Sequence, residues 1–483
     1  MTSTRDEALA AARAHFDGGN FQADLTRRIA MATESQEPSQ RQELYRYLLS
    51  EIGPWLRRYD FAIELFDNPD PAGGPFLLAT RHEDDDATTL LTYGHGDVVR
   101  GIPEQWRDGL DPWTITVEDD RWYGRGTADN KGQHSIIMAA LAQVIETRGR
   151  LGFNAKVLIE TGEEIGSPGL RTFCEQQNEK LAADLFLASD GPRQSPGKAD
   201  ISLGNRGGIS FDLIVNLREG SRHSGHYGGL IEDPGITLAH ALATITDRRG
   251  RILVKDWLPT SVPDSVTEVL RALALDAGDA SLVGPADWGE PGLTPAEKVL
   301  GWTGFIILAF ITGRPENPVN GVQPEARARC QIRFTADVDE ADLLPALRRH
   351  LDEQGFPQVE IRPAGHASFP AWRTDPDNPW VDWTLTSLTE TLDYRPNLIP
   401  NSSGGLPSGF LRTLELPVIW IHALLWRLPS ARTGRASPRR CHARRARDHD
   451  GAFLGPGRLA LDLPLSVDHP RPSSSAISAS VVT

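Results

Sequence analysis

The sequence has 483 residues, of which 39% are hydrophobic and 24% charged, as in ordinary globular proteins. A single hydrophobic core stops growing near roughly 250 to 300 residues, so two domains are expected. The formal net charge of -15 argues against nucleic acid or an anionic membrane as the partner, because both attract basic surfaces.

The amino-terminal stretch 1–16 lacks the apolar core of a signal peptide, because charged residues interrupt it. No uninterrupted apolar run approaches the roughly 20 residues of a membrane-spanning helix. The three cysteines, Cys174, Cys330 and Cys441, are far apart, which argues against a disulfide framework and against a thiolate metal site. We therefore expect a cytoplasmic protein.

Short apolar runs alternate with longer helical patterns between residues 88 and 188. The apolar runs are 89–93, 155–159 and 185–188, and the helical patterns include 134–147 and 169–179. This alternation predicts an α/β fold, with a mostly parallel sheet flanked by helices. In such sheets ligands bind at the carboxyl ends of the strands.

His95 and Asp97 follow the first of these apolar runs. Because they are two positions apart in an extended segment, their side chains point to the same face. A histidine that binds metal usually has its second ring nitrogen held by a carboxylate, and Asp97 is placed to supply it. The alternative is an ordinary histidine at a strand end, followed by a turn aspartate.

Asp129 lies in a glycine-rich turn, directly before a helical pattern that starts near Lys131. A carboxylate has two oxygens and can bridge two cations, which a neutral imidazole does not do. The alternative is an aspartate that caps the helix.

Glu163 and Glu164 follow the second apolar run, and Asp190 follows the third. Adjacent like charges after a buried strand cost free energy unless cations or protons compensate them. One glutamate can bind metal while the other, close to a bound water, acts as a general base. A solvated acidic turn is the alternative.

Taken together, these segments offer oxygen and nitrogen ligands without cysteine, which suits a hydrolytic zinc site better than a structural one. Two ions roughly 3.5 to 4 Å apart acidify a shared water and polarise a substrate carbonyl. The expected reaction is hydrolysis of an amide or peptide bond. Cobalt and manganese suit similar ligands.

The pattern changes near Leu203. Alternating strands are predicted at 209–216 and 326–334, with a helix-like stretch at 234–246 and a segment rich in Pro and Gly at 277–295. We expect an inserted α+β domain at 204–334. The catalytic domain then comprises 1–203 and 335–421, and an atypical tail spans 422–483.

As a set, the segments resemble the dizinc metallopeptidases and amidohydrolases that include acetylornithine deacetylase, succinyl-diaminopimelate desuccinylase, carnosinase-type dipeptidases and carboxypeptidase G. The resemblance covers roughly residues 40–421. It implies two zinc ions per subunit, the first held by His95 and Asp190. Asp129 would bridge the two ions, and Glu164 would hold the second.

The resemblance also implies roles around the ions. Asp97 would orient His95, and Glu163 would be the general base. The peptide bond after Asp129 would be cis. In the inserted domain, His223 of the motif His-Ser-Gly-His-Tyr-Gly-Gly would reach across a homodimer to stabilise the oxyanion, while His226 would be structural.

Substrate-binding roles follow from the same resemblance. Asn320 and Arg333 match the family's lid pair, and an arginine there can clamp a substrate carboxylate. A surface strand arginine is the alternative for Arg333. Gly404 and Gly405 resemble the family's glycine-rich substrate loop, although the order departs from the usual Gly-Gly-Ser-Leu-Pro.

One ligand is missing from this set. In the family, a histidine from a His-x-Pro-Asp/Asn-Glu segment beyond the strand matching 416–421 completes the second zinc site. The tail from about His422 contains no such segment, is rich in Arg, and lacks Lys and Glu. His422, His442 and His449 are candidate substitutes, but their spacing does not favour them.

If codons are read one nucleotide later from the junction of Ala423 and Leu424, the genetic code permits His-Ser-Tyr-Gly-Gly-Cys-Gln-Ala-His-Gly-Pro-Asp-Glu-His. The ligand histidine would then straddle Ala431 and Arg432. We predict a frameshifted ending and an incomplete second zinc site in the chain as written.

The sequence thus predicts a homodimeric zinc hydrolase of dipeptides or small peptides. The motif at His223 favours dipeptidase or carboxypeptidase-like action over deacylation of N-acyl amino acids, which is the alternative. A catalytically impaired homologue and a one-metal enzyme are further alternatives, because one ligand is missing.

Overall fold

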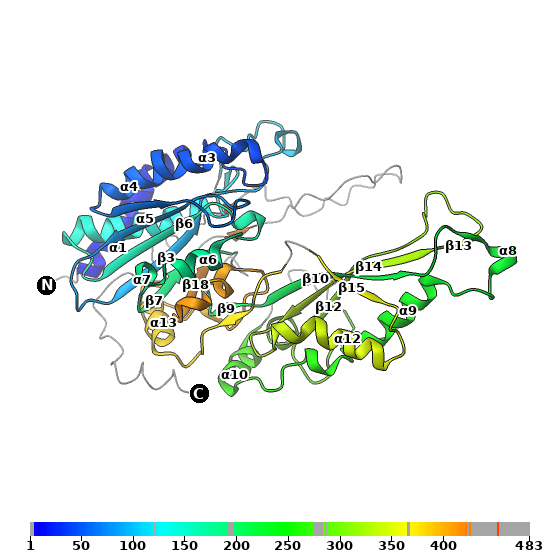
Figure 1. Ribbon diagram of the computed structural model, residues 1–483. Coiled ribbons are helices and arrows are strands. Elements are labelled where there is room, and N and C mark those ends of the chain that lie inside the picture. Colours follow the sequence, from blue (N-terminus) through cyan, green and yellow to red (C-terminus); the bar gives the residue numbers. More distant parts are fainter. Residues whose placement is uncertain are drawn as a thin grey trace. The chain divides into compact units, whose positions relative to one another are not determined.

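The chain folds into two compact units, drawn in the computed structural model of Figure 1. The structure describes residues 4–119, 121–191, 193, 198–274, 284–285, 287–364, 368–422, 425–426 and 452–453. The first unit comprises Met1–Ser202, Asp377–Leu398 and Leu411–Thr483, and the second comprises Leu203–Pro376 and Ile399–Phe410. Within the described residues, no helix combines the length and apolarity needed to cross a membrane.

The first unit is built on a mixed sheet in the order β1-β2-β6-β3-β7-β18-β8-β17. Its strands are β1 (Ala62–Phe66), β2 (Phe76–Arg81), β3 (Thr89–His95), β6 (Asn154–Glu160), β7 (Leu185–Ala188), β8 (Asp200–Ser202), β17 (Asn397–Ile399) and β18 (Val418–His422). The central strands β6, β3, β7 and β18 are parallel. The pairs β1–β2, β2–β6 and β18–β8 are antiparallel. The predicted α/β fold is confirmed, with a parallel centre and antiparallel flanks.

Helices surround this sheet. They are α1 (Thr4–Asp17), α2 (Asn20–Ile29), α3 (Arg41–Arg46), α4 (Gly53–Arg57), α5 (Lys131–Arg148), α6 (Leu170–Gln176), α7 (Asn178–Leu181) and α13 (Pro379–Leu392). Helix α5 contacts β3 on one side and α1 and α2 on the other. Its residues 131–144 are all buried, because a helix enclosed on every side must bury its whole circumference.

A smaller sheet of the first unit has the order β19-β20-β5-β4. Strands β4 (Thr116–Glu118) and β5 (Arg121–Tyr123) lie before α5. Strands β19 (Leu425–Trp426) and β20 (Ala452–Phe453) come from the tail, and β20 pairs with β5. The rest of the tail beyond His422 lies outside the described residues.

The second unit contains an antiparallel sheet in the order β12-β14-β10-β15. Its strands are β10 (Gly207–Asn216), β12 (Gly304–Thr312), β14 (Glu325–Phe334) and β15 (Glu360–Pro363). Helices α9 (Pro234–Ile245) and α12 (Leu343–Glu353) pack on one face, around a core that includes Phe211 and Ile332. Side chains of β14 alternate between this buried face and an open one, as the sequence predicted.

Shorter elements complete the second unit. Helices α10 (Asp264–Ala272) and α11 (Pro295–Leu300) pack on each other. A small hairpin pairs β11 (Arg222–His223) with β13 (Gly321–Val322), and α8 (Ser224–Tyr227) continues from β11.

The observed boundaries of the second unit differ from the predicted ones. The unit begins at Leu203, next to the predicted start at 204, but it continues to Pro376 instead of ending at 334. The reason is that α12 packs on the same core and β15 pairs with β10, so both elements after β14 still belong to this sheet. The segment Ile399–Phe410 also belongs to this unit.

Candidate metal centre

His95, Asp129 and Asp190 meet at one end of the larger sheet of the first unit. Each offers one ligand atom, and these atoms all lie within 4.8 Å of one another. The Nε2 atom of His95 is 2.9 Å from the Asp129 carboxylate and 3.9 Å from the Asp190 carboxylate. The three side chains therefore present one nitrogen and two carboxylates to a common point.

The parallel centre of the sheet explains this meeting. His95 is the last residue of β3, Glu163 and Glu164 follow β6, and Asp190 follows β7. The carboxyl ends of neighbouring parallel strands lie at the same edge, so side chains that follow them converge. Asp129 joins them from the turn that leads into α5.

Asp97 connects the histidine to the glutamate pair. The Nδ1 atom of His95 is 3.4 Å from an Asp97 carboxylate oxygen and 3.1 Å from the Asp97 main-chain oxygen. The same carboxylate accepts hydrogen bonds from the backbone N–H groups of Glu163, at 3.2 Å, and Glu164, at 3.1 Å. One buried carboxylate therefore holds both the ring and the acidic turn.

Asn130 was given no role by the sequence, yet it connects the strand ends. Its peptide bond with Asp129 is cis, as the resemblance implied. Its side-chain amide donates to the Ser189 main-chain oxygen at 3.0 Å. Its side-chain oxygen accepts from the backbone N–H of His95 at 3.3 Å and lies 3.2 Å from the His134 Nδ1 atom. A polar residue directly after the proposed bridging aspartate was the signal that could have revealed it.

Residues in the first turn of α5 form hydrogen bonds next to the site, and the sequence did not indicate these bonds. The buried ammonium group of Lys131 donates to the main-chain oxygens of Arg28, at 2.9 Å, and Met31, at 2.6 Å. Burial lowers the pKa of Lys131 to about 7. The hydroxyl of Tyr47 lies 2.7 Å from the Nε2 atom of His134.

The charges of this cluster fit a cation. Loss of hydration raises the pKa values of Glu163 and Glu164 well above their usual range, and nearby carboxylates contribute while His95 opposes them. Burial likewise raises the pKa of Asp190 to about 6, with the charge of Asp129 adding to it. Grouped carboxylates of this kind are stabilised by protons or by a divalent cation. Nitrogen and oxygen donors without thiolate suit zinc, cobalt or manganese.

His95 is affected in the opposite direction. Burial lowers its pKa, but hydrogen bonds to Asp129 and Asp97 and the charge of Glu163 outweigh burial and raise the pKa well above the usual value. A divalent cation would take the place of that proton at Nε2.

Within the part of the chain that the structure describes, His95, Asp129 and Asp190 form the one group of three or more potential metal ligands. Glu164 lies beside this group and not in it. His422 is also outside it: its Nδ1 atom is 2.6 Å from the Asp190 main-chain oxygen and its Nε2 atom is 2.8 Å from the Ser202 hydroxyl. His442, His449 and the predicted ligand at Ala431 and Arg432 lie outside the described residues.

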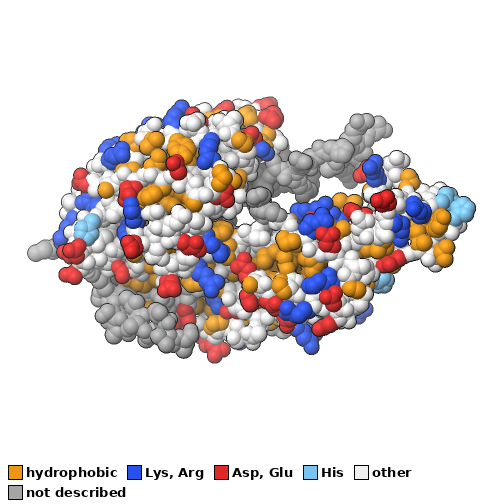
Figure 2. Space-filling view, viewed as in Figure 1, with side chains coloured by type: hydrophobic (Ala, Val, Ile, Leu, Met, Phe, Trp, Pro, Cys, Tyr) orange, Lys and Arg blue, Asp and Glu red, His pale blue; other side chains and the backbone are white. Residues whose placement is uncertain are grey.

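His223 and Asn320 lie together in the small hairpin of the second unit. His223 is exposed and precedes α8, and the Asn320 main-chain oxygen accepts from the backbone N–H of Ser224 at 3.0 Å. The Nδ1 atom of His223 accepts from the backbone N–H of Gly225 at 3.1 Å and lies 3.2 Å from the Nδ1 atom of His226. Figure 2 shows histidine side chains beside hydrophobic ones at the end of the second unit where Figure 1 labels α8.

The other predicted substrate residues lie elsewhere in the second unit. Arg333 is on the open face of β14, with its guanidinium 4.8 Å from the ring centre of Phe369. Gly404 and Gly405 form the loop before the short helix Pro407–Gly409, and Gly405 lies against the same ring.

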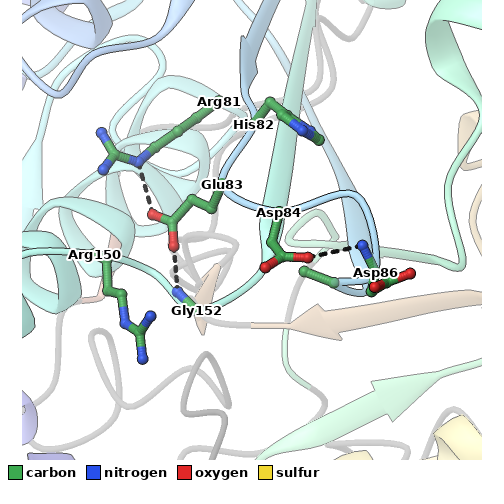
Figure 3. Close-up of a pocket in the computed structure, with 8 residues that line it drawn as sticks. Arg81, His82, Glu83, Asp84, Asp86, Arg150 and Gly152 are labelled. Carbon is green, nitrogen blue, oxygen red and sulfur yellow. Dashed lines mark hydrogen bonds and ion pairs between the residues drawn. The ribbon is translucent and has the colours of Figure 1, made fainter.

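A cavity of about 550 Å³ lies at the other end of β3. Its lining residues are Arg81, His82, Glu83, Asp84, Asp86, Ala87, Arg150 and Gly152. Figure 3 labels all of them except Ala87. Glu83 accepts hydrogen bonds from Arg81 at 2.9 Å and from the backbone of Gly152 at 2.6 Å. Because β3 starts near this cavity and ends at His95, the cavity is separate from the metal centre.

Comparison with known proteins links the chain to dipeptidases. Cysteinylglycine-S-conjugate dipeptidase of Corynebacterium striatum is 25% identical over 366 residues, which are 74% of this chain and 78% of that protein. Human Beta-Ala-His dipeptidase is 31% identical over 271 residues, which are 53% of each protein. The chain therefore aligns with about half the length of the human relative.

Solved structures share the fold. The M20 family metallo-carboxypeptidase Sso-CP2 of Sulfolobus solfataricus matches with a TM-score of 0.71 at 22% identity, over 92% of this chain and 97% of that one. Human carnosine dipeptidase 1 matches with a TM-score of 0.70 at 20% identity, over 96% and 98%. The model of Peptidase family M20/M25/M40 matches residues 91–434, and this confirms the expectation of a hydrolytic enzyme. Because that match covers most of the sequence, the chain belongs to peptidase family M20/M25/M40.

Proposed function

We propose that this protein is a zinc-dependent dipeptidase, which hydrolyses the amide bond of dipeptides or small peptides. The convergence of His95, Asp129 and Asp190 beside Glu163 carries the proposal. The names of the relatives, which describe Cys-Gly and Beta-Ala-His dipeptidases, support this substrate class.

The ligand roles follow the family resemblance, and the donor set supports them. His95 and Asp190 would hold the first zinc, Asp129 would bridge, and Glu164 would hold the second. Bound zinc supplies polarisation of the substrate carbonyl and a lower pKa for water. The predicted histidine of the second site would fall at Ala431 and Arg432, outside the described residues. The first site therefore has the more complete set of ligands among the described residues.

Glu163 would act as the general base. A carboxylate oxygen of Glu163 lies 3.9 Å from the Nε2 atom of His95, at the edge of the ligand group. Its raised pKa suits a group that accepts a proton from the attacking water and returns it to the leaving amine near neutral pH. The hydrogen bond from its backbone N–H to Asp97 holds it in place.

His223 and Arg333 would bind the substrate. Because the Nδ1 atom of His223 accepts from Gly225, a neutral His223 ring carries its proton on Nε2. An N–H at that position can donate to the oxyanion of the tetrahedral intermediate. Arg333 would bind the substrate carboxylate, with Asn320, Gly404 and Gly405 as further contacts.

Strand β12 offers a surface for the homodimer that is expected from the sequence. This strand is at the edge of its sheet, and its hydrophobic side chains are exposed on both faces, with Leu308 at 53% and Ile311 at 57%. An uncovered apolar edge strand pairs readily with another strand. A second copy of β12 would satisfy both its backbone groups and its side chains.

Zinc counting and a substrate panel test the function together. Purified protein loaded with zinc, cobalt or manganese is assayed on dipeptides and, in a parallel arm, on N-acetyl amino acids. We expect dipeptide hydrolysis that EDTA abolishes and zinc restores, and loss of both zinc and activity in Asp190→Ala. Faster cleavage of the N-acetyl amino acids would indicate a deacylase. Bound zinc without hydrolysis of any substrate would indicate an impaired homologue.

A further inference from the structure

Arg333 lies in a row of residues that crosses the open face of the sheet in the second unit. Its direct partners in the pairing register are Gly304 on β12 and Gly208 on β10. On its other side, Gly208 pairs with Phe369 through two backbone hydrogen bonds of 2.9 and 3.0 Å. The row therefore runs Gly304, Arg333, Gly208, Phe369.

The side chain of Arg333 crosses the glycine to reach the aromatic ring. Its guanidinium carbon is 4.8 Å from the ring centre of Phe369, and its Nε donates to the Gln331 side chain at 3.1 Å. A Cβ atom at position 208 would lie 2.7 Å from a ring carbon of Phe369 and 3.4 Å from the Arg333 Nη1 atom. The stack therefore depends on the absence of a side chain at Gly208.

The ring of Phe369 also supports the glycine-rich loop. A Cβ atom at position 405 would lie 3.1 Å from a ring carbon of Phe369, which is tighter than ordinary van der Waals contact. Glycine at 405 thus lets the loop backbone approach the ring. Phe369 is in contact with both substrate segments that the sequence indicated, although the sequence gave it no role.

The backbone of Arg333 is held as well. The buried side chain of Arg206 donates to the Arg333 main-chain oxygen at 3.0 Å and to the Val299 main-chain oxygen at 2.5 Å. Burial lowers the pKa of Arg206 to about 10, with the charge of Arg333 contributing. Arg206 thus holds the backbone of Arg333, and Phe369 contacts its guanidinium group.

We propose that Phe369 is a positioning residue for Arg333 and sets the preference of the enzyme for substrates with a free carboxylate. This inference rests on the proposed role of Arg333 in substrate binding. A stack uses the face of the guanidinium, whereas its N–H groups point along its plane toward a carboxylate. Gly208 and Gly405 provide the space that this arrangement requires.

The kinetic test compares Phe369→Leu with Phe369→Tyr, using alanyl-alanine and its carboxyl-terminal amide as substrates. We expect Phe369→Leu to raise KM for alanyl-alanine by roughly 3- to 10-fold, in line with a partly desolvated cation–π contact, with kcat nearly unchanged. KM for the amide should not change, and Phe369→Tyr should behave as wild type. Gly208→Ala should reproduce the effect of Phe369→Leu.

Phe356→Leu is the matched control. Phe356 is also a half-buried phenylalanine of the second unit, but it packs on the helix-covered core. We expect Phe356→Leu to leave the ratio of the two KM values unchanged. An equal change of both KM values in Phe369→Leu, or a lower kcat alone, would overturn the proposal.

Two measurements separate this inference from the proposed function. If Arg333→Ala keeps the preference for the carboxylate, the assigned role of Arg333 is wrong. Nuclear magnetic resonance of labelled arginine tests the stack without any activity: the ring current of Phe369 should shift the Arg333 Nε–H signal upfield. That shift should disappear in Phe369→Leu and persist in Phe356→Leu, and a signal unaffected by Phe369→Leu would refute the contact.

Discussion

At the scale of single residues, the metal centre is a group of carboxylate side chains that lie close to one another. Asp97 is one of these residues, and its carboxylate accepts two backbone hydrogen bonds and faces His95. The sequence indicated the proposed ligands His95, Glu164 and Asp190 through their places after apolar runs. It could not predict the contacts of Asn130, Lys131 or His134, because these contacts join the start of α5 to segments that are far away in the sequence.

Glu163 and Glu164 are neighbours with different proposed roles, and substitution separates them. We expect Glu163→Gln to lower kcat by at least roughly 100-fold, as for loss of a general base, while the zinc content stays at the wild-type value. Glu164→Gln should instead weaken zinc binding. Activity assays and metal analysis on the same preparations test this, and loss of zinc in Glu163→Gln would contradict the assignment.

Glu160 predicts a pH dependence of stability. It is buried, and its carboxylate accepts hydrogen bonds from Tyr93 and, at 3.0 Å, from Ser167. Burial raises its pKa to about 7, although the hydrogen bonds oppose this. The folded state keeps the Glu160 proton up to a higher pH than the unfolded state does. The free energy of unfolding therefore falls as the pH rises from the unfolded pKa of Glu160 to about 7.

Glu160→Gln removes this dependence. We expect the variant and the wild type to have similar free energies of unfolding below pH 4.5, and the variant to be more stable by about 3 kcal/mol above pH 7. Urea unfolding of EDTA-treated protein across this range measures the difference. A difference that does not vary with pH would show that Glu160 keeps its usual pKa in the folded protein.

At the scale of elements, the periodicity of the sequence predicted the strands but not their partners. The alternation at 326–334 matches the observed β14, whose residues alternate between buried and open faces. The predicted end of the inserted domain at 334 differs from the structure because α12 and β15 return to the same sheet. The local periodicity of a sequence does not show which strands pair when they are far apart in the chain.

Strand β12 gives the prediction at this scale. We expect Leu308→Lys with Ile311→Lys to convert a dimer into a monomer, because two charges on an edge strand oppose pairing with a second copy. Light scattering over a range of protein concentrations measures the mass. Val117→Lys is the control, since Val117 is an exposed strand residue of the first unit, at 43% exposure. A wild-type mass equal to 53.0 kDa at all concentrations would rule out the dimer.

At the scale of the whole molecule, the sequence predicted the family and the α/β fold, and both are confirmed. The motif set was sufficient because most of its segments come at the end of an apolar strand. The extent of the second unit was not predictable in the same way, because Ile399–Phe410 joins it through contacts between residues that are far apart in the sequence. Ile399 packs on Leu300, and the backbone of Ser402 forms hydrogen bonds with the backbone of Gly204 and Arg206.

The predicted frameshift is tested at this scale too. We expect the nucleotide sequence, read one base later after codon 421, to encode the missing histidine segment without an early stop. Protein with the restored ending should bind two zinc ions per chain, and the chain as written about one. Restoration should raise kcat by at least roughly 100-fold. Equal zinc content and activity in the two proteins would contradict the hypothesis.

Strand β18 has a consequence for how the protein is made. It lies between β7 and β8 in the sheet, but it is separated from both in the chain by the whole second unit. A ribosome therefore completes the inserted unit before it supplies the strand that joins β7 to β8, and domains tend to fold as units during synthesis. The second unit can fold while the sheet that carries the metal centre still lacks β18. Any chain that stops before Val418 would thus contain a folded insert within an incomplete catalytic unit.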